Sequence, residues 1–100
     1  MNCKVEFSKF VKTDLKEIKD WYKKINKKLV DRFFEEFENE IKFLAENPSS
    51  KEIKYNNCRI CYLKSFPFGI HYQYFDSNNS ILIIGIYHSS RNPKVWKTIL

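Results

Sequence analysis

Hydrophobic residues in the first half of the chain recur with the period of an α-helix. One stripe runs through Val11, Leu15, Ile18, Tyr22 and Ile25, and a second through Val30, Phe33, Phe37, Ile41 and Leu44. Steps of three and four residues place each set along one side of a helix. Asn26 interrupts the pattern, and Asn47-Pro48 ends it, because proline cannot continue a helix. The two helices are therefore predicted to form an antiparallel pair.

Strand-like patterns occupy most of the remaining chain. An alternating run at residues 4–7 predicts a first strand, and residues 48–57 are polar and are interpreted as a loop. Three further strand-like runs follow at residues 58–66, 70–75 and 81–87. The second and third runs flank a polar hairpin connection. The third run is apolar on both faces, which predicts a central strand.

The C-terminal residues complete the predicted architecture. Asn92-Pro93 is typical of the start of a short final helix, with proline at its first position. The predicted fold is α+β: an N-terminal strand, an α-helical hairpin, a three-stranded antiparallel meander packed against the helices, and a short C-terminal helix or tail. Residues 1–100 are predicted to form a single domain.

Charge is distributed unevenly along the chain, whose formal net charge is +6. Residues 1–50 hold eleven Lys and Arg against ten Asp and Glu, whereas residues 51–100 hold seven against two. A basic half favours an acidic partner, and a merely soluble basic surface is the alternative. No apolar run has the length of a membrane span. Three cysteines without a scaffold pattern favour a reducing, cytoplasmic setting.

Five short patterns occur in an order that is typical of one group of proteins. They are Asp14-Leu15-x-x-Ile18-x-x-x-Tyr22, then Phe33-x-x-x-Phe37 with Ile41-x-x-Leu44 ending at Pro48, then Arg59 ahead of Phe66-Pro67-Phe68, then Ile70-x-Tyr72, and finally His88-x-x-Arg91-x-Pro93-x-x-Trp96. In this order and spacing the chain resembles the RelE/ParE superfamily of toxins from bacterial type II toxin–antitoxin systems. The last pattern looks most like the ParE-like, plasmid-stabilisation branch.

The resemblance implies a growth-inhibiting toxin that a cognate acidic antitoxin, encoded beside it, silences. RelE-like members cleave messenger RNA on the ribosome, whereas ParE-like members poison DNA gyrase without doing chemistry themselves. The nucleases usually carry an arginine at the start of the strand that runs into Tyr72, and this chain has Gly69 there. That departure favours DNA gyrase as the target, with no cofactor and no membrane partner. The alternatives are a ribosome-dependent mRNA endonuclease and a decayed toxin that only binds its antitoxin.

Basic residues in the second half are the candidates for binding a partner or nucleic acid. They are Lys51, Lys54, Arg59, Lys64 and Arg91. If the chain is a nuclease, His88 is the candidate general acid and Arg91 the phosphate clamp, with Arg59 as a third candidate. The alternative role of His88 and Arg91 is structural, at the junction of the last strand with the tail.

Three other residues or motifs invite a functional interpretation. Trp96 either packs the tail onto the sheet or offers a stacking platform, and packing is the simpler interpretation. His71 alternates with Ile70 and Tyr72, so it is predicted to lie on the surface if those two face the core. Cys58-x-x-Cys61 has the form of a redox or zinc site. Zinc would need a second ligand pair, and residues three apart in a strand face opposite sides, so neither role is predicted.

Overall fold

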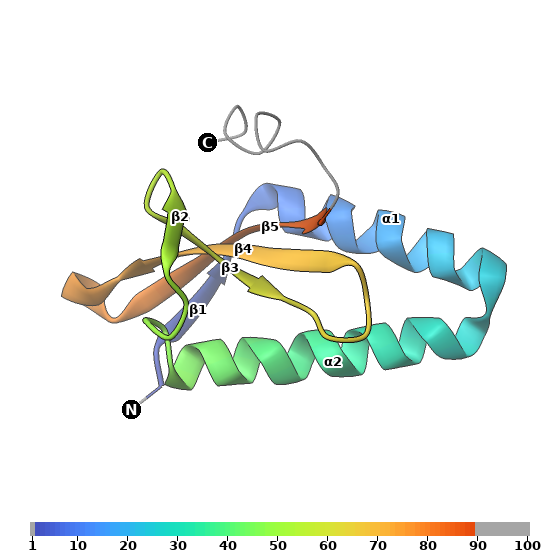
Figure 1. Cartoon of the computed structure of the whole chain (residues 1–100), viewed down its shortest axis with the longest axis horizontal. Helices are drawn as coiled ribbons and strands as arrows, with labels where there is room; N and C mark the ends of the chain where they lie inside the picture. The colour runs from blue at the N-terminus through green and yellow to red at the C-terminus, as the bar shows by residue number, and fades with distance from the viewer. Residues whose placement is uncertain (1, 90–100) are drawn as a thin grey trace.

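The computed structural model describes residues 2–89, which form a helical hairpin packed against one face of a sheet (Figure 1). The elements in order are β1 (Lys4–Phe7), α1 (Lys9–Ile25), α2 (Lys27–Glu46), β2 (Ile53–Tyr55), β3 (Cys58–Tyr62), β4 (Phe68–Phe75), a 3₁₀ turn (Asp76–Asn78) and β5 (Ser80–His88). The α+β class and the order of the predicted elements are confirmed. The predicted C-terminal helix lies outside the described residues.

Polar residues fix both ends of the first helix. The Ser8 side chain accepts a hydrogen bond from the Phe10 backbone N–H and donates one to the Ile84 carbonyl, so the helix start is tied to β5. Asn26 is the single residue between the two helices. Its N–H donates to the Tyr22 carbonyl, and its side chain accepts from the Lys28 N–H. One residue therefore ends α1 and starts α2, which makes the hairpin turn short.

The sheet has five strands in the order β1-β5-β4-β3-β2. β1 pairs with β5 in parallel, and all other pairs are antiparallel. The predicted meander is therefore present as β3, β4 and β5, and one strand is added at each edge. β5 is the central strand that its apolar pattern predicted, since it lies between β1 and β4.

The interpretation of residues 48–57 as a loop is wrong for β2. Asn56 and Asn57 both have positive φ angles, 40° and 59°. Two consecutive residues with positive φ are typical of the tight hairpin turns that match the twist of their flanking strands. They join β2 to β3 and place Ile53 opposite Arg59. A short edge strand thus lies where the polar composition indicated none.

The first meander strand ends earlier than predicted, at Tyr62 instead of Phe66. The backbone N–H groups of Lys64 and Ser65 donate to the Glu36 carboxylate of α2, at 2.6 and 3.3 Å. A helix side chain therefore takes hydrogen bonds that a longer strand would have given to its neighbour. The following strand starts at Phe68, two residues before its predicted start.

Each face of the sheet has its own buried cluster. Phe33 of α2 is fully buried in the larger, inner cluster, where its ring contacts those of Tyr22, Phe37 and Phe66. The smaller, outer cluster contains Tyr55, Cys58, Ile60, Ile84 and Tyr87. In β5, Gly85 pairs with His71 and Ile83 with Tyr72, so Ile84 is an extra residue. Strand alternation places Ile83 in the inner cluster and Ile84 in the outer one. The bulge shifts that alternation, so Ile86, three residues after Ile83, also lies in the inner cluster.

Candidate functional site

Arg59 holds the loop after α2 against the sheet. Its guanidinium Nη1 donates to the carbonyl oxygens of Ser49 and Lys51, at 3.2 and 2.5 Å. The side chain is half-buried. The guanidinium thus donates hydrogen bonds to the backbone of residues 49–51. Its positive charge lies beneath that loop and does not project from the surface.

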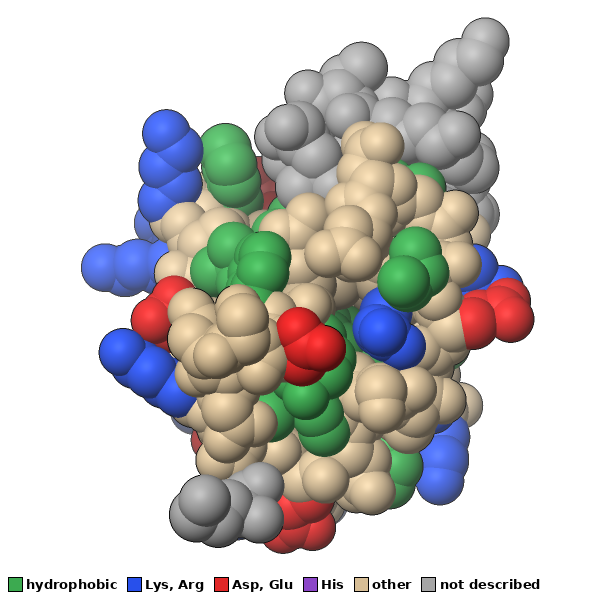
Figure 2. Space-filling model, turned by 90° about the vertical axis from the view of Figure 1, so that its left-hand side faces the viewer, with side chains coloured by type: hydrophobic (Ala, Val, Ile, Leu, Met, Phe, Trp, Pro, Cys, Tyr) green, Lys and Arg blue, Asp and Glu red, His purple; other side chains and the backbone are tan. Residues whose placement is uncertain are grey.

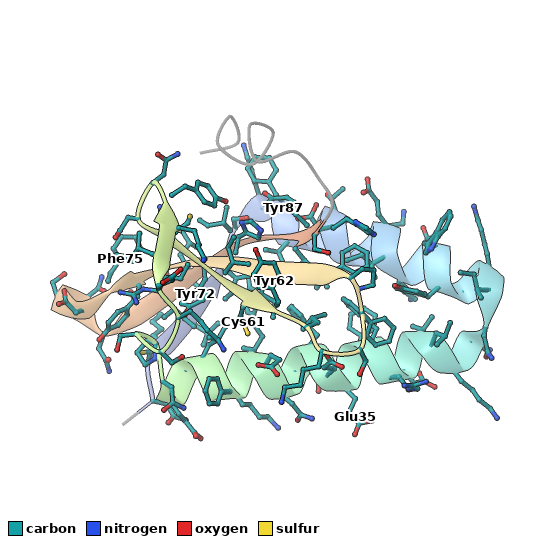
Figure 3. The ribbon with its side chains drawn as sticks, viewed as in Figure 1. Glu35, Cys61, Tyr62, Tyr72, Phe75 and Tyr87 are labelled. Atoms are coloured by element: carbon teal, nitrogen blue, oxygen red, sulfur yellow. The ribbon has the colours of Figure 1, made fainter. Side chains whose placement is uncertain are left out.

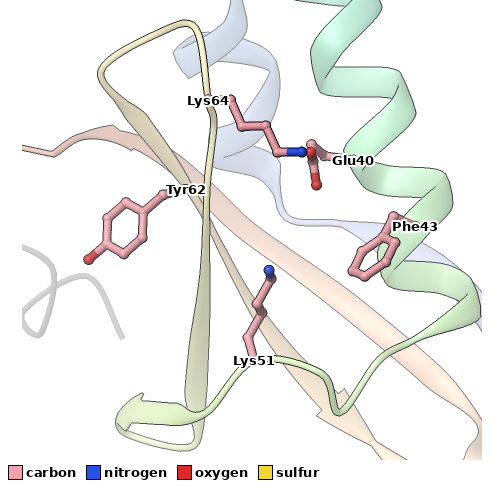
Figure 4. Close-up of a pocket in the computed structure, with 5 residues that line it drawn as sticks. All are labelled: Glu40, Phe43, Lys51, Tyr62 and Lys64. Carbon is pink, nitrogen blue, oxygen red and sulfur yellow. The ribbon is translucent and has the colours of Figure 1, made fainter.

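Lys51 and Lys64 lie at one hollow of about 170 Å³, between α2 and the β3 edge (Figure 4). Glu40, Phe43 and Tyr62 complete its lining. Figure 4 shows the Lys64 side chain extending toward Glu40 of the helix and the Lys51 side chain rising from its loop between Tyr62 and Phe43. The Tyr62 ring points away from both lysines. The Lys51 ammonium lies 5.6 Å from the centre of the Phe43 ring.

The hollow offers charge of both signs and an aromatic surface. Glu40 faces the two lysines and also accepts a hydrogen bond from the Cys61 thiol, at 3.3 Å. No histidine contributes to its lining. Two ammonium groups beside a carboxylate and an aromatic ring suit contact with a partner side chain. The sequence pointed to the two lysines but not to Glu40 or Phe43, whose spacing of three residues on α2 is the one signal that they share a face.

The remaining candidates do not converge on that hollow. Lys54 forms an exposed ion pair with Glu52, at 2.5 Å. His88 is half-buried at the end of β5, and its ring centre lies 5.3 Å from that of Phe68. Arg91 and Trp96 lie outside the described residues. The structure thus brings together two of the five predicted basic residues, Lys51 and Lys64.

Gly69, which the resemblance sets at the place where the superfamily's nucleases usually carry arginine, is closely packed. It pairs with Tyr62 of β3 and Tyr87 of β5. A Cβ atom at Gly69 would lie 2.8 Å from Ile60 Cγ2 and 3.2 Å from a ring carbon of Tyr62. Since Ile60 belongs to the outer cluster, the missing side chain would project toward that face. Any side chain at this position would therefore require Ile60 and Tyr62 to shift.

The prediction that His71 lies on the surface is wrong, because the outer face of the sheet is covered. His71 is fully buried, and its Nδ1 lies 2.7 Å from the Tyr55 hydroxyl in a hydrogen bond. Its ring also packs edge-on against Tyr87, with centres 4.8 Å apart. Burial lowers the pKa of His71 to about 4. The imidazole is therefore neutral near physiological pH.

The two cysteines of the C-x-x-C motif lie on opposite faces, as the strand period predicted. Cys58 belongs to the outer cluster and Cys61 to the inner one. Figure 3 shows Cys61 on the side of the sheet that faces α2 and Tyr87 on the other side. Burial raises the pKa of Cys61 to about 12, so its thiol stays protonated and unreactive. Within residues 2–89, no group of three or more His, Cys, Asp or Glu side chains is placed to hold a metal ion.

Comparisons with known proteins agree with this geometry. The solved chromosomal ParDE toxin–antitoxin system from P. aeruginosa has a similar chain, with a TM-score of 0.73 and 18% identity over 86% of this chain and 95% of that one. A mutant of the E. coli toxin RelE in the free state gives a TM-score of 0.62 and 18% identity over 100% of both chains. The intact E. coli RelBE complex gives a TM-score of 0.58 and 16% identity over 89% and 99%.

At such low sequence identities, these structural similarities show a shared fold only. The family assignment depends on a match to the sequence itself. No relative was found among curated protein sequences. None of the helices in the described part of the chain is long and apolar enough to cross a membrane. The model of one family, the ParE toxin of type II toxin–antitoxin systems, matches residues 5–93. The chain therefore belongs to the ParE toxin family of type II toxin–antitoxin systems.

Proposed function

We propose that this toxin acts by binding DNA gyrase and that an acidic antitoxin silences it. The observation that carries the choice of target is the packing at Gly69. A Cβ atom at Gly69 would lie 2.8 Å from Ile60 and 3.2 Å from Tyr62, and this crowding opposes an arginine at the position that the resemblance assigns to charge stabilisation in the nucleases. A nuclease needs such a group close to a general acid and a base.

The positions of the other candidates support a binding function over RNA cleavage. Arg59 donates to two backbone carbonyls, and the His88 ring packs against Phe68. The face around His71 is closed by aromatic and aliphatic side chains. Inhibition by contact requires a surface but no reacting groups, and the hollow at Lys51 and Lys64 supplies charge beside an aromatic ring.

An apolar hollow of about 330 Å³ between β1 and α2 is the proposed antitoxin site. Phe7, Phe37 and Ile41 line it, and Phe7 is 52% exposed. A partly exposed aromatic beside a helix suits the apolar side of an amphipathic segment. Because the toxin carries a formal net charge of +6, a segment with acidic residues around its apolar side fits best.

The target is tested by adding purified toxin to two reactions. We expect inhibition of plasmid supercoiling by gyrase and no cleavage of messenger RNA on translating ribosomes. Cleavage that disappears with His88→Ala or Arg91→Ala, with gyrase unaffected, would replace gyrase by the ribosome as the target. Neither activity, together with normal growth on induction, would mean a decayed toxin.

The antitoxin site is tested with the short acidic protein encoded beside the toxin gene. Phe7→Asp should abolish co-purification of the two proteins, because a carboxylate would be buried against an apolar segment. Phe75→Asp is the matched control, since Phe75 is 38% exposed and lies outside the hollow. Equal co-purification of wild type and Phe7→Asp would remove this hollow from the interface.

A further inference from the structure

Helix α1 carries a row of lysines parallel to its apolar stripe. Lys12, Lys16, Lys19 and Lys23 follow one another at steps of four, three and four residues. Each comes directly after an apolar stripe residue: Val11, Leu15, Ile18 and Tyr22. These steps place the four lysines along one side of the helix, next to the stripe but outside the core. All four are exposed.

The row continues across the hairpin turn onto α2. Lys19, Lys23 and Lys27 line one hollow of about 290 Å³ between the two helices, together with Val30 and Asp31. We call Lys12, Lys16, Lys19, Lys23 and Lys27 the lysine ridge. Lys27 lies in the first turn of α2, which holds no acidic residue.

No ridge lysine forms an ion pair within the described part of the chain, and Asp31 is the one acidic residue that lines the ridge hollow. The ion pairs among residues 2–89 are Lys4–Glu6 and Lys54–Glu52, and neither involves the ridge. Lysines one turn apart on a helix repel each other and destabilise it. By contrast, the end of the molecule seen in Figure 2 shows basic and acidic side chains interspersed with hydrophobic ones. An anionic partner would remove the repulsion along the ridge.

The chemistry of the ridge selects among anionic partners. A protein helix needs an apolar seam to bury, and Val30 is the one apolar residue that lines the ridge hollow. Trp21, which is 61% exposed, comes two residues after Lys19 and so points to the other side of α1. The ridge therefore lacks both a hydrophobic anchor for a protein and an aromatic platform for unpaired bases. A line of point charges suits a backbone of regularly spaced phosphates.

We propose that the lysine ridge binds the phosphate backbone of double-stranded DNA. The binding is independent of sequence, because the ridge offers charge and no side chain for reading bases. It is also independent of the gyrase proposal, since it needs only the toxin and DNA. On the cell's DNA, such a surface would hold the toxin close to an enzyme that acts on the same molecule.

The test is fluorescence anisotropy of a labelled duplex titrated with the purified full chain at several salt concentrations. Five phosphate contacts, one for each ridge lysine, predict a slope of log affinity on log salt of about −4.5, which weakens binding by roughly 500-fold between about 50 and 200 mM salt. Lys16→Ala with Lys23→Ala should make the slope shallower by about 1.8 and weaken binding more than about tenfold at the lower salt concentration. Alanine preserves the helix, and circular dichroism checks it.

Two matched variants separate the ridge from general charge. Lys16→Arg with Lys23→Arg keeps both charges and should keep the slope. Lys4→Ala with Lys42→Ala removes the same charge from exposed positions outside the ridge and should leave the slope within about 0.5 of the wild-type value. An equal loss in this control and in the ridge variant would overturn the proposal.

Other partners are outcomes of the same experiment. Absence of binding at about 50 mM salt with roughly 100 μM protein would overturn the proposal, because even non-specific complexes are tighter than that. Tenfold preference for duplex RNA, or for an acidic peptide, would assign the ridge to that partner instead. Stronger binding to phosphatidylserine vesicles that Trp21→Ala abolishes would assign the surface to a membrane.

Discussion

The two faces of the sheet are both buried, but they are built differently. The inner face packs against the helical hairpin through a network of aromatic rings centred on Phe33. The outer face has no helix among the described residues. It is closed by side chains of its own strands, with a neutral histidine hydrogen-bonded to Tyr55 at the centre.

The difference teaches where this member of the family has room for chemistry. A face that is not covered by helices is a natural place for polar groups to converge on a substrate. Here, Tyr55, Ile60 and Tyr87 fill the outer face, and the histidine among them is buried. Under the proposed function, partner contacts fall on the rims of the molecule, at the hollow beside Lys51 and at the exposed Phe7.

Removal of a central inner ring should have the largest effect. Phe33 is fully buried and contacts five neighbouring aromatic rings. We expect Phe33→Ala to lower the free energy of unfolding by about 3–5 kcal/mol, through lost burial and an unfilled cavity. Urea denaturation of both proteins measures this. Phe10→Ala, at a 44% exposed position, should cost less than about 1 kcal/mol. Similar losses for the two variants would contradict the central position of Phe33.

Acid should destabilise the outer face through its histidine. Burial lowers the pKa of His71 to about 4, whereas an unfolded histidine titrates near 6.5. The folded state disfavours the proton, so this stabilisation is complete above about pH 6.5 and is lost as the pH falls toward about 4. The full difference is roughly 3 kcal/mol.

Carboxylates also titrate in this range, so the comparison of variants is decisive. The free energy of unfolding of Tyr55→Phe with His71→Phe should lack this part of the pH dependence, because nothing buried there titrates between pH 4 and 7. His88→Gln, at the half-buried end of β5, should retain it. The same pH dependence in wild type and in the double variant would show that His71 is not buried as a neutral group.

A side chain introduced at Gly69 should have a smaller effect that bears on function. A Cβ there would meet Ile60 at 2.8 Å, and overpacking of this kind typically costs about 1–3 kcal/mol. We expect Gly69→Arg to lower the free energy of unfolding by that amount and to give no mRNA cleavage in a ribosome assay. Cleavage by this variant would show that the outer face accepts a catalytic side chain.

The inner face could be predicted from the sequence far better than the outer face. The helical stripes and the apolar run of β5 predict which residues are buried, because each pattern is contained within one helix or strand. The closure of the outer face depends on β2, and β2 depends on the positive φ angles of Asn56 and Asn57. An Asn-Asn pair between Tyr55 and Cys58 is itself a hairpin signal that the polar surroundings obscured. His71 was expected at the surface because that strand was not counted.

The candidate site shows a similar division. The sequence identified Arg59 and Lys64 as candidate binding residues by their charge alone, whereas the contacts they make are with residues distant in the sequence. The Arg59 guanidinium binds the carbonyls of Ser49 and Lys51, and the Lys64 backbone donates to Glu36. Such contacts depend on how α2 lies against β3, which no local pattern reports. The sequence identified which residues are basic, but only the folded structure shows which of their side chains are already engaged in contacts within the chain.

The smallest expected effect on the free energy of unfolding concerns the C-x-x-C motif, whose two cysteines lie on opposite faces of the sheet. Cys58 lies in the outer cluster and Cys61 in the inner one, so the strand itself separates the two thiols. A disulfide between them would require the strand to turn over. We expect the free energies of unfolding in reducing and in mildly oxidising buffer to differ by less than about 0.5 kcal/mol. Thiol titration should find three free cysteines in both denatured samples. A disulfide linking Cys58 to Cys61 in the folded protein would contradict the register of β3, because both side chains would then have to reach the same face.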